Sequence, residues 1–281
     1  MTIVYIYDTE VFAYDWLLVA KDLETGAYTI ISNDCGAVRD FFNENQDAIF
    51  CGFNSKNYDR YIVTAMAGGL SAPEIKQIND WIIGGRQGWE CPLLIQLNPS
   101  FFRNIDIMDD TQKGQSLKSI EGHLGMSIEE SGVPFDIDRK LTDAEMKETI
   151  HYCCHDVDAT EQLFRIRKDY LQSKITIGEL AGIPAHQALA MTNAKLTAAF
   201  LKAKPPAQPW DDERQYIYPD NLKTEYIPQE VFDFFDRMYN PLISDEDLFS
   251  SKLEINVGGT PGIVGFGGIH AAIPNYMWGS K

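Results

Sequence analysis

The sequence lacks the features that mark secreted and membrane proteins. No apolar run among its 281 residues approaches the roughly 20 residues needed to cross a bilayer. The N-terminus has no basic region and reaches an acid at Asp8, so it does not have the pattern of a signal peptide. We therefore expect a cytoplasmic protein, inside a cell that could be a bacterial host, without membrane contact.

Cysteine and positive charge are also scarce. The five cysteines are an odd number and contain no C-x-x-C pair, so we expect reduced, buried thiols and neither a disulfide framework nor a zinc clamp. Only 24 Lys and Arg stand against 41 Asp and Glu, a net charge of −17. This balance disfavours broad binding of duplex DNA, which needs many cations against the phosphates. A site that binds divalent cations must itself be acidic, so a metal-dependent enzyme is not excluded.

The hydrophobic pattern predicts a strand meander followed by alternating strands and helices. Residues 3–32 contain three stretches rich in β-branched and aromatic residues, which favour strands. The apolar run 48–53 is typical of a buried strand, and 101–108 is a further candidate. Shorter helices are expected at 37–43, 57–69, 73–84, 116–125, 179–203 and 229–239.

The best-defined helix begins at Thr142. Thr142 and Glu145 form the S/T-x-x-E capping box, and the segment then continues without Gly or Pro to about residue 172. This order of elements indicates an α/β domain over residues 1–175. Residues 204–220 contain four prolines and mixed charge, which predicts a linker or an extended arm.

Three short segments carry carboxylates in positions suited to a shared site. Asp8 and Glu10 end the first strand, and residues two apart in a strand point to the same face. Asp59 follows the buried strand at the start of a helix. Asp156 lies in the long helix, four residues after Tyr152 and therefore one turn away on the same face. Taken singly, each has an ordinary alternative, such as a solvated turn for Asp8 and Glu10 or a helix cap for Asp59.

Asp-x-Glu, Asn-x₃-Tyr-Asp and Tyr-x₃-Asp, in this order, resemble the three motifs of the DEDD superfamily of 3′→5′ exonucleases. The resemblance implies a ribonuclease H-like fold, a mixed sheet flanked by helices. It also implies two Mg²⁺ or Mn²⁺ ions, which oxygen ligands suit. Asp8 would bridge both ions, with Glu10 and Asp156 completing one of them, and Asp59 acting mainly through water. Tyr152 would orient the attacking water. The implied reaction removes nucleoside 5′-monophosphates from the 3′ end of single-stranded or frayed DNA.

Two further segments resemble bacteriophage DNA polymerases. The stretch VPFDIDRKLTDAEMKETIHYCCHDVDAT is similar to their exonuclease region, and GFGGIHAAIPNY is similar to the part that precedes the polymerase catalytic motif. The resemblance implies that residues 1–175 form the exonuclease domain. Residues 176–281 would be a linker plus a partial polymerase-associated region, mostly helical or irregular, without a polymerase active site. A polymerase domain or another replication protein is the expected partner.

His151 leaves a second spacing open. It lies five residues before Asp156, which also satisfies the His-x₄-Asp spacing of the other DEDD branch. In a continuous helix, the position four residues before Asp156 lies about 40° from it and the position five before about 140° away. Helix geometry therefore favours Tyr152.

Residues near the motifs are candidates for contact with a nucleic acid. Phe12, Tyr14 and Phe53 could stack on terminal bases, although packing is the alternative for each ring. By the resemblance, Asn54 would touch the terminal nucleotide. Cations that could meet phosphates, or simply face solvent, are Lys56, Arg60, Arg103, Lys113 and Lys118.

Two other functions remain open from the sequence. Ribonuclease D-like enzymes share the same acidic constellation, so RNA is an alternative substrate. The second alternative is a non-catalytic nucleic-acid-binding or interaction module, because a fold does not guarantee an activity.

Overall fold

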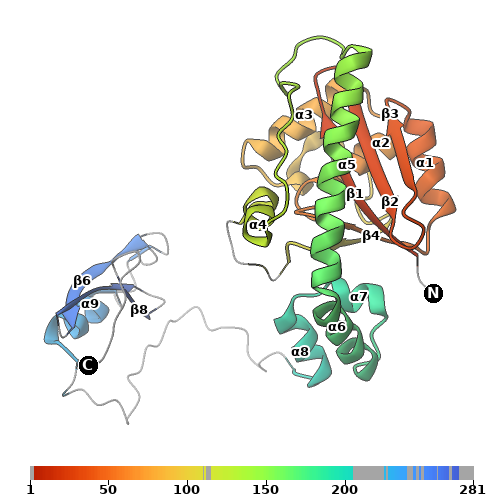
Figure 1. Ribbon diagram of the computed structural model, residues 1–281. Coiled ribbons are helices and arrows are strands. Elements are labelled where there is room, and N and C mark those ends of the chain that lie inside the picture. The colour runs from red at the N-terminus through yellow and green to blue at the C-terminus, as the bar shows by residue number, and fades with distance from the viewer. Residues whose placement is uncertain are drawn as a thin grey trace. The chain divides into compact units, whose positions relative to one another are not determined.

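A five-stranded mixed sheet organises the first part of the chain (Figure 1). Its strand order is β3-β2-β1-β4-β5, with β1 at the centre. β1 pairs antiparallel with β2 and parallel with β4, while β2–β3 is antiparallel and β4–β5 parallel. The α/β architecture predicted from the sequence is confirmed, and it agrees with a ribonuclease H-like fold. The strands are β1 (Val4–Val11), β2 (Trp16–Asp22), β3 (Tyr28–Ser32), β4 (Ile49–Gly52) and β5 (Arg103–Asp106).

The computed structural model describes residues 3–109, 111, 115–204, 225, 227–238, 243–244, 247, 250–257, 259–265 and 268–271. Contacts divide the chain into two compact units, Met1–Ala203 and Lys204–Lys281. The boundary expected at residue 175 instead falls inside a helix. The first unit extends further because the helices that follow pack on one another and on β5.

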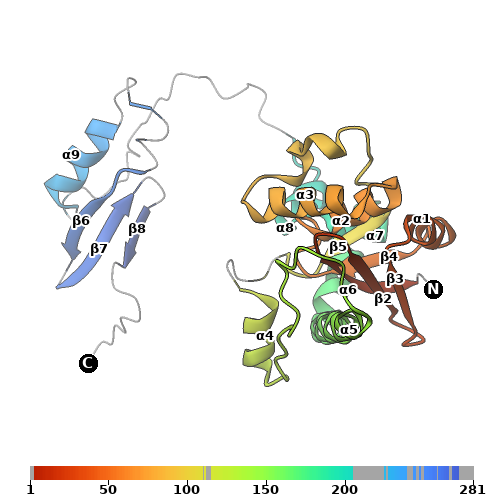
Figure 2. The same cartoon turned by 90° about the horizontal axis from the view of Figure 1, so that it is seen from above.

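Helices cover both faces of the sheet (Figure 2). On one face, Tyr7 and Val11 of β1 pack in a core with Phe42, Phe50 and residues of the first three helices. On the other face, Ile6 packs in a second core that the long helix α5 completes. Odd and even positions of β1 therefore face different cores, as the two-residue period of a strand requires. The helices on the first face are α1 (Cys35–Glu44), α2 (Asp59–Gly68) and α3 (Ala72–Ile83), and the long one is α5 (Asp143–Ile166).

The long helix begins where the sequence predicts and ends earlier. The Thr142 side chain accepts from the Glu145 backbone N–H, and the Glu145 side chain accepts from the Thr142 N–H, which completes the capping box. The helix does not continue to residue 172, because it is interrupted at Arg167, whose φ and ψ are −88° and 9°. The Arg167 guanidinium donates to the carbonyls of Ile107 and Asp109, which ties this break to the turn after β5.

The predicted helical stretch 179–203 is divided into separate helices. Gly182 adopts a positive φ of 73° and Pro184 caps the next helix, so no continuous helix crosses this point. The remaining helical segments of the first unit are η1 (Gly88–Glu90), η2 (Pro92–Leu94), α4 (Leu117–Leu124), α6 (Lys168–Leu180), α7 (Ala185–Ala190) and α8 (Asn193–Phe200).

The second unit contains a helix and a three-stranded antiparallel sheet in the order β6-β7-β8. Val231 and Phe234 of the helix pack with Ile255 and Val264 of the sheet. For residues 176–281 we expected mostly helical or irregular structure; the described residues include helices, as expected, and this sheet in addition. The predicted linker 204–220 lies almost wholly outside the described residues, as do most of 265–276. The elements are α9 (Gln229–Met238), β6 (Leu253–Val257), β7 (Thr260–Gly265) and β8 (Gly268–Ala271).

Within the described part of the chain, no helix is both long and apolar enough to cross a membrane.

Candidate metal centre

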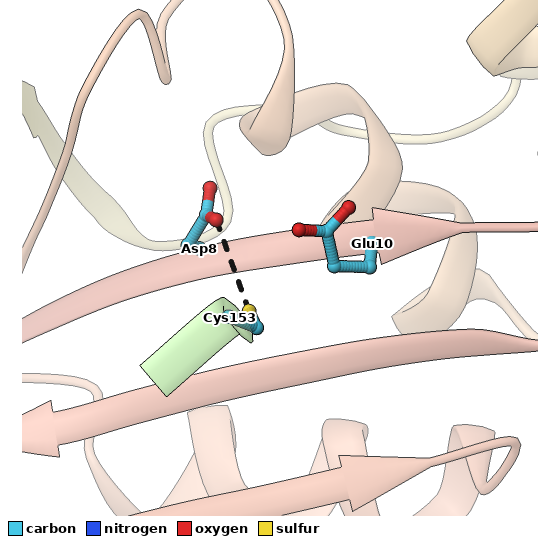
Figure 3. Close-up of side chains that lie close together, drawn as sticks. All are labelled: Asp8, Glu10 and Cys153. Carbon is cyan, nitrogen blue, oxygen red and sulfur yellow. Dashed lines mark hydrogen bonds between the residues drawn. The ribbon is translucent and has the colours of Figure 1, made fainter. Parts of the chain in front are cut away.

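Asp8 and Glu10 lie near the end of the central strand β1, on the face that α5 covers (Figure 3). Burial and the neighbouring acids raise the pKa of Asp8 well above its usual range. Burial, with Asp156 and Asp59 nearby, raises the pKa of Glu10 to about 8. Both carboxylates therefore resist ionisation unless positive charge is brought to them.

Asp156 approaches this pair from α5. Its Oδ1 accepts from Lys118 Nζ at 2.8 Å, and the same ammonium group donates to the Glu129 carbonyl at 2.6 Å. Lys118, on α4, also lies 4.6 Å from the centre of the Tyr152 ring. Lys118 therefore binds protein groups of the candidate site, whereas we predicted it as a substrate contact. That contact stays a prediction.

Asp59 is the first residue of α2 and is 2% exposed. Its Oδ1 accepts from the Thr9 hydroxyl at 2.6 Å. Burial and Asp106 raise its pKa, opposed by the Thr9 hydrogen bond, to about 7. The turn before α2 depends on Asn54, which has a positive φ of 58° and whose carbonyl accepts from the Tyr58 N–H. Asn residues tolerate this left-handed conformation better than most.

The four predicted acids thus lie close together around Asp8. Asp59, Glu10 and Asp156 all raise the pKa of Asp8. Ligand atoms of Asp8, Glu10 and Cys153 lie within 4.8 Å of one another, and so do those of Glu121, His155 and Asp156. Asp59 belongs to neither group. The structure therefore holds acidic groups that could bind metal ions, with Asp59 beside them.

These residues fit divalent cations by their chemistry. Buried carboxylates that lie close together raise the free energy of the folded chain when they are ionised. An Mg²⁺ or Mn²⁺ ion accepts oxygen ligands and offsets this repulsion. Among the described residues, Lys118 is the cation that pairs with Asp156, and its charge also lowers the pKa of Glu10. One ammonium charge does not balance four carboxylates.

Tyr152 and His151 are placed differently with respect to the acids. Tyr152 is half-buried, and its pKa is raised by burial, by the Asp156 charge and hydrogen bond, and by Glu10. The His151 side chain is 77% exposed, and its Nδ1 lies 3.5 Å from Glu129. The phenol therefore faces the carboxylates and the imidazole does not, in agreement with the helix geometry.

The three predicted base-stacking rings differ in how accessible they are. Phe12 is 1% exposed and stacks on Phe135 at 5.3 Å between ring centres, so it is a packing residue here and cannot offer a face to a base. Phe53 is half-buried against the α5-side core. Tyr14 is 42% exposed, and Asn54 is half-buried with its side chain accepting from Asn57. Lys113 lies outside the described residues.

Three residues of the site were not singled out from the sequence. Thr9 lies between the two acids of β1 and reaches Asp59 on the opposite side of the strand. Cys153 donates to Asp8 Oδ2 at 3.8 Å, and burial raises its pKa well above the usual range, so the thiol stays protonated. Its place three residues before Asp156 was the available signal. Glu121 is fully buried beside Asp156 and His155, and burial raises its pKa.

Comparisons with known proteins complete the description. No protein-family model matches the chain, and no curated protein matches it either. Among solved structures, the chain is similar to the family B DNA polymerase from the hyperthermophilic archaeon Pyrobaculum calidifontis, with a TM-score of 0.45 and 15% sequence identity. The match covers 72% of this chain and 29% of that polymerase, so the chain spans less than a third of its length.

Proposed function

We propose that this chain is a metal-dependent 3′→5′ exonuclease acting on single-stranded or frayed DNA. The observation that carries the proposal is the burial of carboxylates from β1, α2 and α5 beside one another. Asp59, Glu10 and Asp156 each raise the pKa of Asp8. The order and spacing of the three motifs, which resemble those of DEDD exonucleases, are the second support.

Each acidic residue has a role that follows from its position. Asp8 and Glu10, fixed on one face of the central strand, would hold the ions together with Asp156 from α5. Asp59, held by the Thr9 hydroxyl, would act from the far side of β1. When bound, two divalent ions supply an activated water and stabilise charge on the leaving 3′-oxygen.

Tyr152 would position the water. Its raised pKa keeps the hydroxyl protonated at neutral pH, so it donates a hydrogen bond and does not act as a base. Lys118 holds Asp156 in a fixed orientation through their 2.8 Å contact. Tyr152 and Lys118 would thus act by positioning the water and Asp156.

We further propose that the chain is a proofreading-type part of a phage-like DNA polymerase. The support is the resemblance of its long-helix segment to the exonuclease region of such enzymes. In this proposal the product is a nucleoside 5′-monophosphate, and the partner is a polymerase domain.

The test is digestion of a 3′-fluorescent single-stranded oligonucleotide with Mg²⁺ or Mn²⁺. Asp8→Ala should lower the rate by about a thousandfold, the size expected when a main stabiliser of transition-state charge is lost. Asp40→Ala is the matched control, because Asp40 is an exposed residue of α1. EDTA should abolish the wild-type activity.

Three outcomes would overturn parts of the proposal. An unchanged rate in Asp8→Ala would favour a binding module. Faster digestion of a matched RNA oligonucleotide would change the substrate. Release of nucleotides from the 5′ end would change the polarity.

A further inference from the structure

A second candidate site is a pocket of about 890 Å³ beside β5. The wall combines β5 with the β4–α2 loop, α2, the end of α1 and α7. Its size is within the usual range of small-molecule sites. None of its fourteen lining residues is an Asp or Glu, although the chain holds 41 acids and 24 Lys and Arg. The lining instead includes Lys56, Arg60, Arg103 and His186.

This pocket is distinct from the carboxylate site. Strand register places Asn104 beside Phe50, and Phe50 beside Tyr5 of β1. Asp8 lies three residues further along β1 and two strands away, about 10 Å along the strands and about 10 Å across them. The pocket also borders the core of the α1–α3 face, to which Phe42 and Phe102 belong, whereas Asp8 and Glu10 face α5.

Two donors on the pocket wall have no acceptor among the described residues. Arg60 Nε and Asn104 Nδ2 are both buried and without a hydrogen-bond partner. Arg60 Nη2 donates only to neutral oxygens, Pro99 O and Ser100 Oγ, each at 3.2 Å. No described carboxylate pairs with Arg60. A buried donor without a partner is unfavourable, and an anionic acceptor would remove that cost after a small side-chain rotation.

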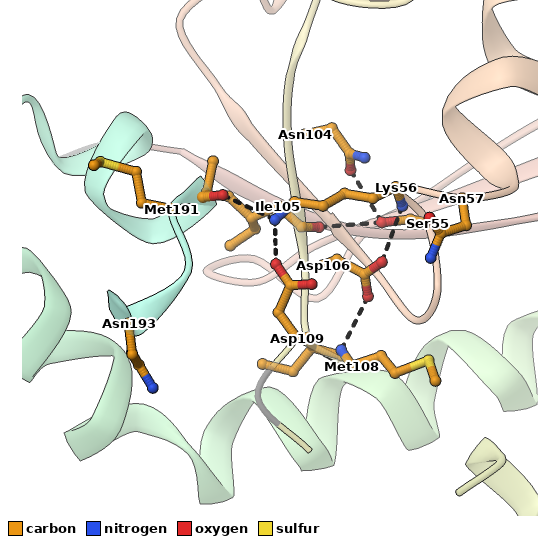
Figure 4. Close-up of polar contacts among 12 residues, drawn as sticks. Ser55, Lys56, Asn57, Asn104, Ile105, Asp106, Met108, Asp109, Met191 and Asn193 are labelled. Atoms are coloured by element: carbon orange, nitrogen blue, oxygen red, sulfur yellow. Dashed lines mark hydrogen bonds and ion pairs between the residues drawn. The ribbon is translucent and has the colours of Figure 1, made fainter. Parts of the chain in front are cut away.

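The other cations are oriented by protein contacts. Lys56 reaches from the β4–α2 loop to Asp109 and to the Ala190 carbonyl at 2.9 Å (Figure 4). Its charge is therefore largely compensated. Arg103 pairs with Asp47, whose side chain is 96% exposed, and such an exposed ion pair is weak. Arg60 and Arg103 are the two guanidinium groups available to an anion.

The remaining lining suits a nucleoside. Amides of Asn43, Gln46 and Gln187 can donate to and accept from base edges, and Phe101 is a half-buried ring. Guanidinium groups bind phosphate oxygens in bidentate fashion. We propose that the pocket binds a nucleotide, with Arg60 and Arg103 on its phosphate and the amides and Phe101 on its base. The site does not require the carboxylates, so it stands independently of the proposed nuclease function.

The test is calorimetric titration of the full chain with dAMP in EDTA, which removes divalent ions from the carboxylate site. We expect saturable binding to wild type, and Arg60→Gln or Arg103→Gln should weaken it about tenfold, the effect of one charged hydrogen bond of about 1.4 kcal/mol. Arg39→Gln is the matched control. Arg39 is exposed, lies outside the pocket, and like Arg60 donates to a backbone carbonyl. Thermal melts establish that each variant is folded.

Titrations with other ligands, alone or in competition with dAMP, identify the natural occupant. Competition by an unphosphorylated oligonucleotide would support a DNA strand as the occupant, and competition by mononucleotides alone would support a free nucleotide. Equal affinity for inorganic phosphate would overturn the base contacts, and equal affinity for deoxyadenosine would overturn the phosphate contacts. Absence of dAMP binding at about 1 mM, or unchanged affinity in Arg60→Gln, would overturn the site itself.

Discussion

At the scale of single residues, the candidate site depends on whether Tyr152 or His151 of α5 faces the carboxylates. Tyr152 does so and His151 does not, although they are neighbours in sequence. Successive helix positions are turned by about 100°, so one residue decides whether a group contacts the site or the solvent.

Replacing Tyr152 tests this difference. Tyr152→Phe removes only the hydroxyl, so we expect kcat to fall about 100-fold while KM and Mn²⁺ binding stay near wild type. Single-turnover digestion and manganese titration by electron paramagnetic resonance would measure the two effects. His151→Gln is the comparison variant and should retain the wild-type rate. The reverse result, with His151→Gln impaired and Tyr152→Phe active, would contradict the assignment.

The candidate ligands could be predicted from the sequence because their spacing follows the periods of strands and helices. Asp8 and Glu10 share a face by the two-residue period, and Tyr152 and Asp156 by the helical turn. Contacts that depend on tertiary packing could not be predicted. The pairing of Lys118 with Asp156 and the stacking of Phe12 on Phe135 both join segments far apart in sequence.

At the scale of elements, the long helix α5 supplies Asp156 and Tyr152 and is fixed at its start by the Thr142 capping box. Arg139 also forms a bidentate ion pair with Glu145, in which Nη1 donates to Oε2 at 2.8 Å and Nη2 donates to Oε1 at 2.7 Å. The start was predictable because a capping box is a local signal. The end at Ile166 was not, because Arg167 is held by carbonyls of the distant segment after β5.

Removal of the cap should weaken the helix without affecting the site. Thr142→Ala is expected to cost about 1 kcal/mol, and to lower the Tm of a unit of this size by about 2–4 °C. Asp156 lies fourteen residues further along, about 20 Å from the cap, so nuclease activity at 25 °C should be unchanged. Thermal melting by circular dichroism is the measurement. The control Thr176→Ala, an exposed position inside α6, should change stability by less than about 0.5 kcal/mol. An equal effect of both variants would argue against the cap.

At the scale of the whole molecule, the buried acids oppose folding when no metal is bound. The pKa of Glu10 rises from 4.5 to about 8 on folding, and that of Asp59 from 3.8 to about 7. The folded chain therefore binds more protons than the unfolded chain between about pH 4 and pH 8. Stability from these groups is complete below the unfolded values and is lost as pH rises through the folded values.

Unfolding in EDTA should follow this sign. We expect the Tm to be several degrees lower at pH 8.5 than at pH 6, and Mn²⁺ to raise it more at pH 8.5, where the acids are ionised. Glu10→Gln should reduce the pH dependence, because its amide does not titrate. Scanning calorimetry at both pH values measures the effect. A Tm that stays constant or rises with pH in EDTA would contradict the expectation.

The alternation of residues along β1 also restricts how the chain can change in length. Asp8 and Glu10 face α5, while Tyr7, Thr9 and Val11 face the other way. Loss or gain of one residue ahead of Asp8 would turn both acids toward the phenylalanine-rich core and present a threonine to α5. Insertions and deletions in this part of the molecule are therefore tolerable in the exposed turn at residues 24–27, and not within the strand itself.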